Sequence, residues 1–202
     1  MPRIAEPREP GRPSTTSQHA RRRAIQRAAA RLGAEHGLER VQMSDIAAAA
    51  GVALGTLYRY YPSKHHLYSG VLGAAVTDLP DRPGAAADPV LAVADFLEDA
   101  VGRLLRYPLL GRAMLVSANA VRSAGTVAVD TTLRDRILAV AGIAEPDAAD
   151  LQLARLAEQC AYGILTWATA GQLGASEAAA DMRRACLLLL APWAAGRRPE
   201  PE

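Results

Sequence analysis

The chain has 202 residues, of which half are hydrophobic and 4% aromatic, and it carries a formal net charge of +2. Its longest apolar runs are far shorter than the about 20 residues that a membrane span requires, and its proline-rich, basic N-terminus has no apolar stretch behind it. These features exclude a membrane protein, and we expect a soluble, cytoplasmic one.

Positive charge is concentrated in the N-terminal part of the chain. Residues 1–64 carry 11 Lys and Arg against 5 Asp and Glu, whereas the remaining residues carry 12 against 16. This asymmetry indicates an anionic partner for the N-terminal part. We expect nucleic acid rather than a membrane, because the sequence has no basic amphipathic helix with large apolar anchors.

Apolar residues recur at helical spacing and β-branched and aromatic residues are sparse, which predicts an all-α fold of about nine helices. Residues 1–16 have prolines and charges but almost nothing apolar, so we expect a mobile basic arm. Ser17 is the predicted N-cap of the first helix and Gly37 its stop. The helices predicted over 17–78 are Gln18–His36, Met43–Ala50, Leu54–Tyr61 and one from Ser63 to about Val76.

The second part of the chain, residues 79–202, begins with a linker, LPDRPGAAADP. Its predicted helices are Pro89–Tyr107, Pro108–Ala118, Val127–Val140, Asp147–Ala170 and Ser176–Ala191. The run CAYGILTWA at 160–168 is apolar nearly all round, so it needs packing partners on more than one side.

The stretch GVALGTLYRYYPSKHHLY, residues 51–68, holds four of the six tyrosines and the only lysine. Two short helices joined by Gly51, with Pro62 after the second, have the length and punctuation of a helix-turn-helix. On a helical wheel Leu57 and Tyr61 fall on one side and predict a small core. The opposite side carries Gly55, Thr56, Tyr58, Arg59 and Tyr60.

The side chains of this stretch suit contacts to DNA. Hydroxyls and the lysine can donate to phosphates, the arginine can pair with guanine, and an apolar side chain at the helix start can meet a thymine methyl group. The candidate DNA-binding residues are Leu54, Gly55, Thr56, Tyr58, Arg59, Tyr60 and Lys64. An isolated tyrosine on a short helix more often packs into a core, and we assign that role to Tyr61 and Tyr68.

The segment VQMSDIAAAAGVALGTLYRYYPSKHHLY resembles the DNA-binding domain of the TetR family of bacterial transcriptional regulators. The shared pattern is D-I-A, then A-G-V, then G-T-L-Y-x-Y-F-x-S-K, then L. The resemblance implies that Tyr58, Tyr60 and Lys64 contact mostly phosphate while the start of the helix contacts bases. Two positions depart from the pattern: Gln42 replaces the usual serine or threonine N-cap, and Tyr61 replaces the usual phenylalanine.

Weaker similarity in RYPLLGRAM and ILTWATAG is to the branch of the family that contains repressors of steroid and cholesterol catabolism. The resemblance implies a helix-turn-helix domain over 17–64, a connecting helix to about 78, and a ligand-binding and dimerisation domain over 79–202. TetR-like proteins dimerise through their last two helices, and the apolar excess of 147–170 and 176–191 independently requires burial. A homodimer predicts a palindromic operator on double-stranded DNA, and a monomeric core is the alternative.

Members of the family commonly release DNA when a small molecule binds between the central helices. The large apolar side chains that we expect to line such a pocket, although each also suits a plain core, are Phe96, Leu97, Leu104, Met114, Leu115 and Trp167. The scarcity of charge over 160–170 favours a hydrophobic ligand, such as a sterol or an acyl-CoA thioester. The expected function is a ligand-responsive transcriptional repressor, and the alternative is a DNA-binding regulator without a small-molecule effector.

An enzyme needs a convergent set of polar catalytic groups. All four histidines lie in the predicted DNA-binding part, and the sequence has no nucleophile elbow and no metal-ligand spacing. We therefore expect neither catalysis nor a cofactor or metal.

Overall fold

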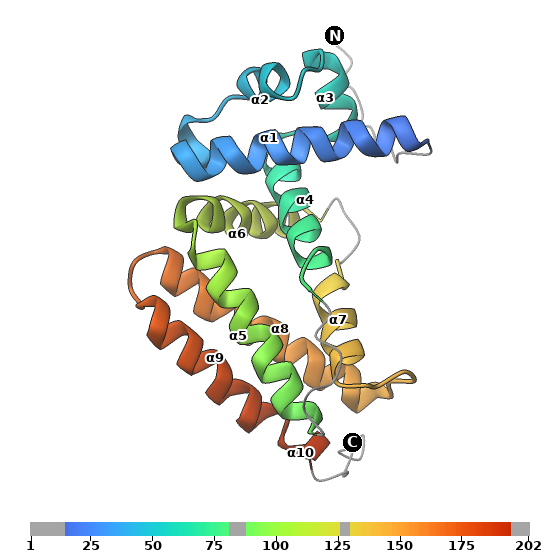
Figure 1. The fold of residues 1–202 in the computed structure, drawn as a ribbon, viewed down its shortest axis with the longest axis vertical. Coiled ribbons are helices and arrows are strands. Elements are labelled where there is room, and N and C mark those ends of the chain that lie inside the picture. The colour runs from blue at the N-terminus through green and yellow to red at the C-terminus, as the bar shows by residue number, and fades with distance from the viewer. Residues whose placement is uncertain (1–14, 81–87, 126–129, 195–202) are drawn as a thin grey trace. The chain divides into compact units, whose positions relative to one another are not determined.

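The computed structural model describes residues 15–80, 88–125 and 130–194, and all regular structure within these ranges is helical (Figure 1). The described chain falls into two compact units. Within the described ranges the first unit comprises residues 15–72 and 113–125, and the second comprises 73–80, 88–112 and 130–194. The predicted all-α fold with about nine helices is confirmed, since nine helices of seven or more residues lie in the described ranges.

The first unit contains α1 (Thr16–Arg40), α2 (Met43–Ala49), α3 (Leu54–Tyr60) and the start of α4 (Lys64–Thr77). The second half of α6 (Pro108–Ser123) also belongs to it. Its buried side chains include Ile25, Ala28, Ala29, Val41, Ile46, Ala47, Leu57, Tyr61, Leu67 and Tyr68. The apolar periodicity of α1 and α4 thus places one side of each helix in this core.

The ends of these helices follow local hydrogen-bonding rules. Thr15, rather than the predicted Ser17, caps α1, because its hydroxyl accepts from the backbone N–H of Gln18 at 3.3 Å. Gly37 interrupts α1 with φ 73°, a conformation that glycine adopts without strain, so the predicted stop is present as a kink. Ser63 accepts a hydrogen bond from the N–H of His66 and so caps α4.

The second unit contains α5 (Pro89–Leu105), the start of α6, α7 (Thr132–Val140), α8 (Ala148–Thr169), α9 (Ala175–Leu189) and α10 (Ala191–Ala194). Asp88 caps α5 and Asp147 caps α8. The helix predicted from Val127 begins at Thr132, and residues 126–129, like the arm 1–14 and most of the linker, lie outside the described residues. None of the described helices is both long and apolar enough to span a membrane.

Packing in the second unit centres on α5, which lies along α9 and also contacts α7 and α8. The core is formed by large side chains of α5 against small ones of the long helices: Val93, Phe96, Leu97, Val101, Ala154, Ala157, Ala161, Ala178, Met182 and Cys186. The alanines allow α8 and α9 to approach α5 closely. This arrangement leaves the opposite sides of α8 and α9 outside the core.

The short helix α10 was absent from the sequence prediction. It fixes the end of the described chain because the indole Nε1 of Trp193 donates to the fully buried carboxylate of Asp150 at 2.9 Å. A buried carboxylate needs such partners to offset its lost hydration. Asp150 therefore connects the start of α8 to α10.

Candidate functional site

The turn between α2 and α3 has a fixed geometry. Gly51 has φ 66°, and the N–H of Val52 donates to the carbonyl oxygen of Ala47 at 3.0 Å. A residue with a Cβ atom is strained in this backbone conformation. The two short helices are thus held at a set angle by the turn and by the buried side chains of Ile46 and Leu57.

The outer face of α3 carries large exposed side chains that have no carboxylate near them in the sequence. Leu54 is 43% exposed and Tyr58 is 47% exposed, Arg59 is also exposed, and Thr56 is half-buried. No carboxylate occurs between Asp45 and Asp78 in the sequence. A solvated face with apolar, hydroxyl and cationic groups and no acid matches what a reading helix presents to a DNA groove.

Gly55 leaves the backbone of α3 uncovered on this face. A Cβ atom added at Gly55 would have no other atom within 4 Å, so the absence of a side chain leaves open space in front of the helix. Because Gly is unfavourable within a helix, its presence here is not explained by stability. Close approach of a partner to the backbone of α3 would explain it.

Tyr60 is not on the exposed face where we expected it. Its side chain is only 5% exposed, and its hydroxyl is buried with no hydrogen-bond partner in the described part of the chain. The reason is geometric, since residues three apart on a helix share a side and Tyr60 follows Leu57 by three. The guanidinium of Arg59 covers the ring, with Cζ 5.6 Å from its centroid. The predicted phosphate contact of Tyr60 therefore requires its hydroxyl to become exposed.

Lys64 has two partners within the protein. Its Nζ donates to the carbonyl oxygens of Leu38 and Val41 at 2.7 and 3.0 Å, which ties the start of α4 to the end of α1. An ammonium group has three protons, so one remains for a further acceptor such as a phosphate. From the sequence we expected only the DNA contact of Lys64. The carbonyl group of Leu38 is 26 residues away in the chain, and no local sequence pattern indicates such a partner.

Tyr61 lies in the core, as predicted, and its hydroxyl accepts a hydrogen bond from Nε of Arg22 at 3.1 Å. Burial raises the pKa of this phenol, and the neighbouring guanidinium partly offsets the shift, so the hydroxyl stays protonated. Gly70 faces the ring so closely that an added Cβ would lie 2.8 Å from Cε1. The pairing with Arg22 was missed from the sequence, although tyrosine in place of phenylalanine was a signal for it.

Tyr68 also packs, as expected. It is fully buried, and its hydroxyl donates to the carbonyl oxygen of Ala29 at 3.1 Å. Burial raises the pKa of this phenol to about 12. On the same unit His65 Nδ1 lies 3.1 Å from the hydroxyl of Ser117, which connects α4 to the second half of α6.

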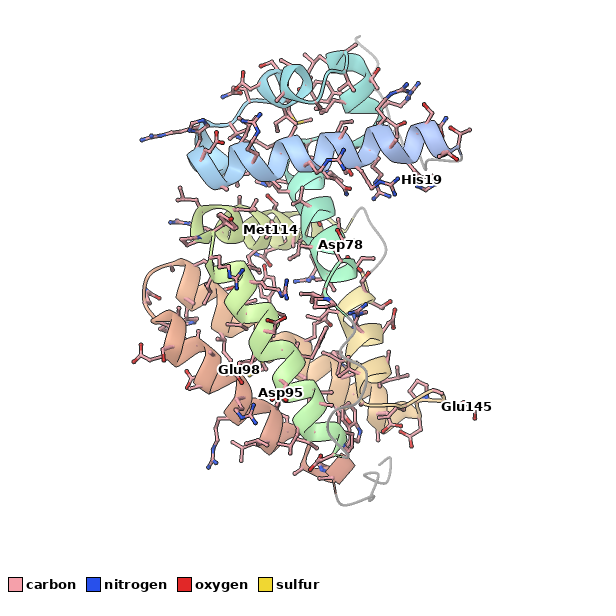
Figure 2. The ribbon with its side chains drawn as sticks, viewed as in Figure 1. His19, Asp78, Asp95, Glu98, Met114 and Glu145 are labelled. Atoms are coloured by element: carbon pink, nitrogen blue, oxygen red, sulfur yellow. The ribbon has the colours of Figure 1, made fainter. Side chains whose placement is uncertain are left out.

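Basic residues also cover the start of α1. Arg21, Arg23 and Arg27 are exposed, and the first carboxylate along the described part of α1 is Glu35. His19 projects from the same end of the helix (Figure 2). The positive charge that the sequence assigned to the N-terminal part is therefore on the surface of the first unit.

The candidate ligand-binding residues are distributed over both units. Phe96 and Leu97 are buried in the core of the second unit, and Leu104 is half-buried at the end of α5. Met114, labelled on α6 in Figure 2, is buried like Leu115, and both belong to the first unit. Trp167 is 61% exposed.

Trp167 lines an open hollow of about 390 Å³ on the second unit. The other lining residues come from α8, α9 and the segment between them: Cys160, Gly163, Ile164, Leu173 and Asp181. Five of the six are apolar or weakly polar. Ile164 and Leu173 also pack against the core of this unit, so the hollow lies at the border between that core and the exposed Trp167.

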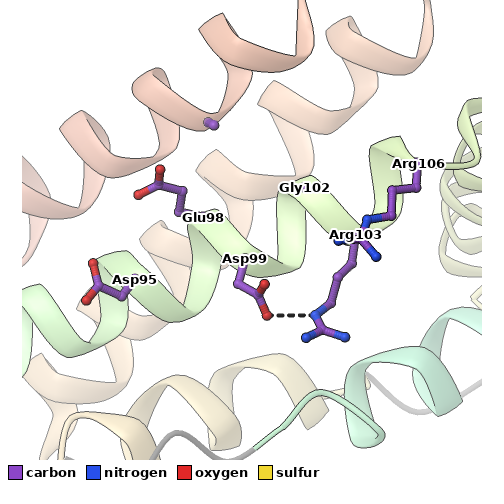
Figure 3. Close-up of a pocket in the computed structure, with 7 residues that line it drawn as sticks. Asp95, Glu98, Asp99, Gly102, Arg103 and Arg106 are labelled. Atoms are coloured by element: carbon purple, nitrogen blue, oxygen red, sulfur yellow. Dashed lines mark hydrogen bonds and ion pairs between the residues drawn. The ribbon is translucent and has the colours of Figure 1, made fainter. Parts of the chain in front are cut away.

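A second open hollow, of about 660 Å³, follows α5 (Figure 3). Its lining is charged and comes from one face of α5, with Ala179 of α9 on the other side: Asp95, Glu98, Asp99, Gly102, Arg103 and Arg106. Arg103 pairs with Asp99 at 2.6 Å, and Arg183 of α9 pairs with Asp95 and Glu98. Internal ion pairs therefore account for most of this charge.

The geometry of α2, the Gly51 turn and the exposed face of α3 defines a helix-turn-helix DNA-binding protein. Two family models match the chain: one described as bacterial regulatory proteins of the tetR family over residues 25–71, and one described as the tetracyclin repressor-like C-terminal domain over residues 87–189. The chain therefore belongs to the TetR family, and it is a DNA-binding transcriptional regulator rather than an enzyme.

Individual relatives agree with this assignment. The HTH-type transcriptional repressor KstR of Rhodococcus jostii (strain RHA1) is 32% identical over 195 residues, which cover 93% of this chain and 90% of that protein. A TetR transcriptional regulator from Rhodococcus sp. RHA1 has a solved structure with 39% identity and a TM-score of 0.77, and the match covers 88% of this chain and 98% of that one.

A more distant structure shares the fold. The TetR family repressor FadR of Thermus thermophilus, solved in complex with lauroyl-CoA, is 21% identical with a TM-score of 0.61. The match covers 90% of this chain and 99% of that one.

Proposed function

We propose that the protein is a cytoplasmic repressor that binds a palindromic operator as a homodimer and reads it with α3. The observation that carries this proposal is the exposed face of α3, where Leu54, Gly55, Tyr58 and Arg59 are presented without a neighbouring carboxylate. Relatives that cover most of the chain are named repressors, which supports repression as the mode of regulation.

Roles can be assigned along the helix. Leu54, Thr56 and Arg59 are suited to base edges, because apolar contact reads the thymine methyl group and arginine reads guanine. Tyr58 is suited to phosphate through its exposed hydroxyl, and Lys64 through its third proton. Gly55 lets the helix backbone approach the floor of the groove.

The test is to select bound sequences from a random DNA library and then to measure affinity by fluorescence anisotropy. Tyr58→Phe and Lys64→Ala should weaken binding to all sequences to a similar extent, whereas Thr56→Ala and Arg59→Ala should also change base preference. Glu35→Ala, on the outer surface of α1, is the control and should leave base preference unchanged. If affinity and base preference were unchanged in all four variants, the proposal that α3 binds in a DNA groove would be wrong.

Homodimerisation is supported by the apolar sides of α8 and α9 that the core leaves open. Leu156, Trp167, Leu187 and Leu188 are exposed there, and Leu188 is 63% exposed. The spacing of 156, 160, 164 and 167 places one stripe along α8, and this stripe borders the hollow that Asp181 of α9 also lines. A two-fold interface would pair these sides and cover the hollow.

Light scattering coupled to size-exclusion chromatography tests the interface. Leu188→Glu should shift the protein from dimer to monomer, because it places a charge in an apolar contact. Leu109→Glu changes a leucine that is 49% exposed on α6 and is the matched control. A dimer that persists in Leu188→Glu at micromolar concentration would place the interface elsewhere.

A hydrophobic effector, sterol-like or an acyl-CoA thioester, is proposed to bind the second unit and release DNA. The support is the apolar character of this unit and a fold shared with a protein solved with lauroyl-CoA. Melting temperature and operator affinity should be measured with lauroyl-CoA, a sterol and no ligand. A regulator without an effector, the second candidate, would show no response of either quantity to any apolar compound.

A further inference from the structure

Arg22 of α1 is hydrogen-bonded to Tyr61, the residue that follows the last residue of α3. Its Nε donates to the hydroxyl of Tyr61 at 3.1 Å, a contact between residues 39 positions apart in the chain. Tyr61 is the C-cap residue of α3 and is only 4% exposed, so its hydroxyl has a fixed position. The cationic group of Arg22 therefore lies beside the hydroxyl of the residue that ends α3.

The packing around Tyr61 leaves its ring little freedom. Gly70 of α4 lies against the ring edge, since a Cβ there would be 2.8 Å from Cε1, and the amide of Gln26 donates to the carbonyl oxygen of Gly70 at 3.0 Å. Three elements, α1, the end of α3 and α4, thus meet at this phenol. A side chain anchored to such a point loses little further freedom when it binds a partner.

The anchored guanidinium retains donors for a partner. A guanidinium carries five N–H groups, and the contact with Tyr61 uses the single one on Nε. Arg22 is half-exposed, and it has no carboxylate partner in the part of the chain that the structure describes. The two terminal nitrogens form the fork that pairs with phosphate oxygens.

The charge around this position favours an anion. Arg59 lies two residues before Tyr61, Arg21 and Arg23 flank Arg22, and no acid precedes Glu35 within the described part of α1.

We propose that Arg22 donates to a phosphate of the DNA backbone at the C-terminal end of α3, and that the Tyr61 hydroxyl positions Arg22 for this contact. The proposal deepens the proposed function and rests on it, because it assumes that α3 is the reading helix. Tyr61 is then a positioning residue, and the phenol hydroxyl has a role that phenylalanine at this position lacks.

The experiment is a double-mutant cycle on DNA affinity, measured by anisotropy on one selected duplex over a range of salt concentrations. Arg22→Ala should weaken binding about tenfold and lower the slope of log affinity against log salt by about 0.9, because one phosphate contact is lost. Tyr61→Phe should weaken binding several-fold in the native background and not at all in the Arg22→Ala background.

Two matched controls separate this role from general effects. Tyr68→Phe removes another buried hydroxyl that connects α4 to α1, through Ala29, and should leave the salt slope unchanged with the same small effect in both backgrounds. Arg31→Ala removes a charge from the same helix that is paired with Glu35 at 3.6 Å, and should change the slope by far less than Arg22→Ala.

The outcomes distinguish the alternatives. If Arg22→Ala lowers the melting temperature but leaves affinity and salt slope unchanged while Tyr58→Phe and Arg59→Ala weaken binding, the pair only holds α1 to α3 and this proposal is overturned. An equal slope change in Arg31→Ala would also overturn it, since the effect would be one of overall charge. If no variant on α3 affects binding, the proposed function itself fails.

Discussion

Nζ of Lys64 lies 2.7 Å from the carbonyl oxygen of Leu38, so the only lysine of the chain joins the start of α4 to the segment after the Gly37 kink. A hydrogen bond from a charged donor contributes more than a neutral one. This ammonium group is therefore one of the contacts that hold α4 against α1, together with the hydrogen bond from Tyr68 to Ala29.

Lys64→Met keeps most of the aliphatic stem and removes both hydrogen bonds to backbone carbonyls. The free energy of unfolding should fall by about 1.5 to 3 kcal/mol, measured by urea denaturation. Lys64→Arg, which can still donate, should lose less. A variant that loses DNA affinity but keeps full stability would show that Lys64 acts through DNA alone.

Tyr60→Phe should leave the protein as stable as the native chain or more stable by up to about 1 kcal/mol, because it removes a buried hydroxyl that has no partner. Tyr68→Phe is the matched control, since it removes a hydroxyl that donates to Ala29, and it should cost about 1 kcal/mol. Chemical denaturation checks both values. A clear loss of stability in Tyr60→Phe would mean that this hydroxyl is satisfied in solution.

Gly70→Ala and Gly55→Ala should have opposite effects on stability. At Gly70 the new methyl group would meet the Tyr61 ring, and overpacking of this kind costs about 1 to 3 kcal/mol. At Gly55 it would meet nothing, so the gain in helix propensity should stabilise by about 0.5 to 1 kcal/mol. Anisotropy should show weaker DNA binding for Gly55→Ala in spite of its higher melting temperature. Equal stability of the two variants would contradict the contact at Gly70.

His66 should make the protein less stable at mildly acidic pH. Burial, and secondarily the nearby His65, lower the pKa of His66 below its ordinary value, so below about pH 6.5 the unfolded chain binds a proton that the folded chain resists. Stability is therefore unaffected by this group above that pH and falls as pH decreases toward the lowered pKa. The melting temperature of His66→Asn, measured from pH 7.5 to 5.5, should fall less steeply than that of the native chain, and parallel curves would contradict the assignment.

Most of the helices, and those helix ends that carry a proline or glycine signal, could be predicted from the sequence because they depend on local features. Pro89 and Pro108 start helices where expected, Gly37 interrupts α1, and Gly51 forms the turn before α3. The pattern from Asp45 to Leu67 was also sufficient to identify the TetR family. The side chains of α3 were harder to predict: Tyr61 lies in the core as expected, but Tyr60, which was expected on the exposed face, also packs inward.

The sequence by itself determined the all-α fold, the helix-turn-helix and the concentration of positive charge in the first unit, since periodicity, caps and composition are properties of neighbouring residues. Only the tertiary structure decided that Lys64 donates to Leu38, that Arg22 is anchored by Tyr61, and that the second half of α6 belongs with the N-terminal helices. These contacts join residues far apart in the chain, and the partner of a hydroxyl or an ammonium group is chosen by the packing that brings the two together.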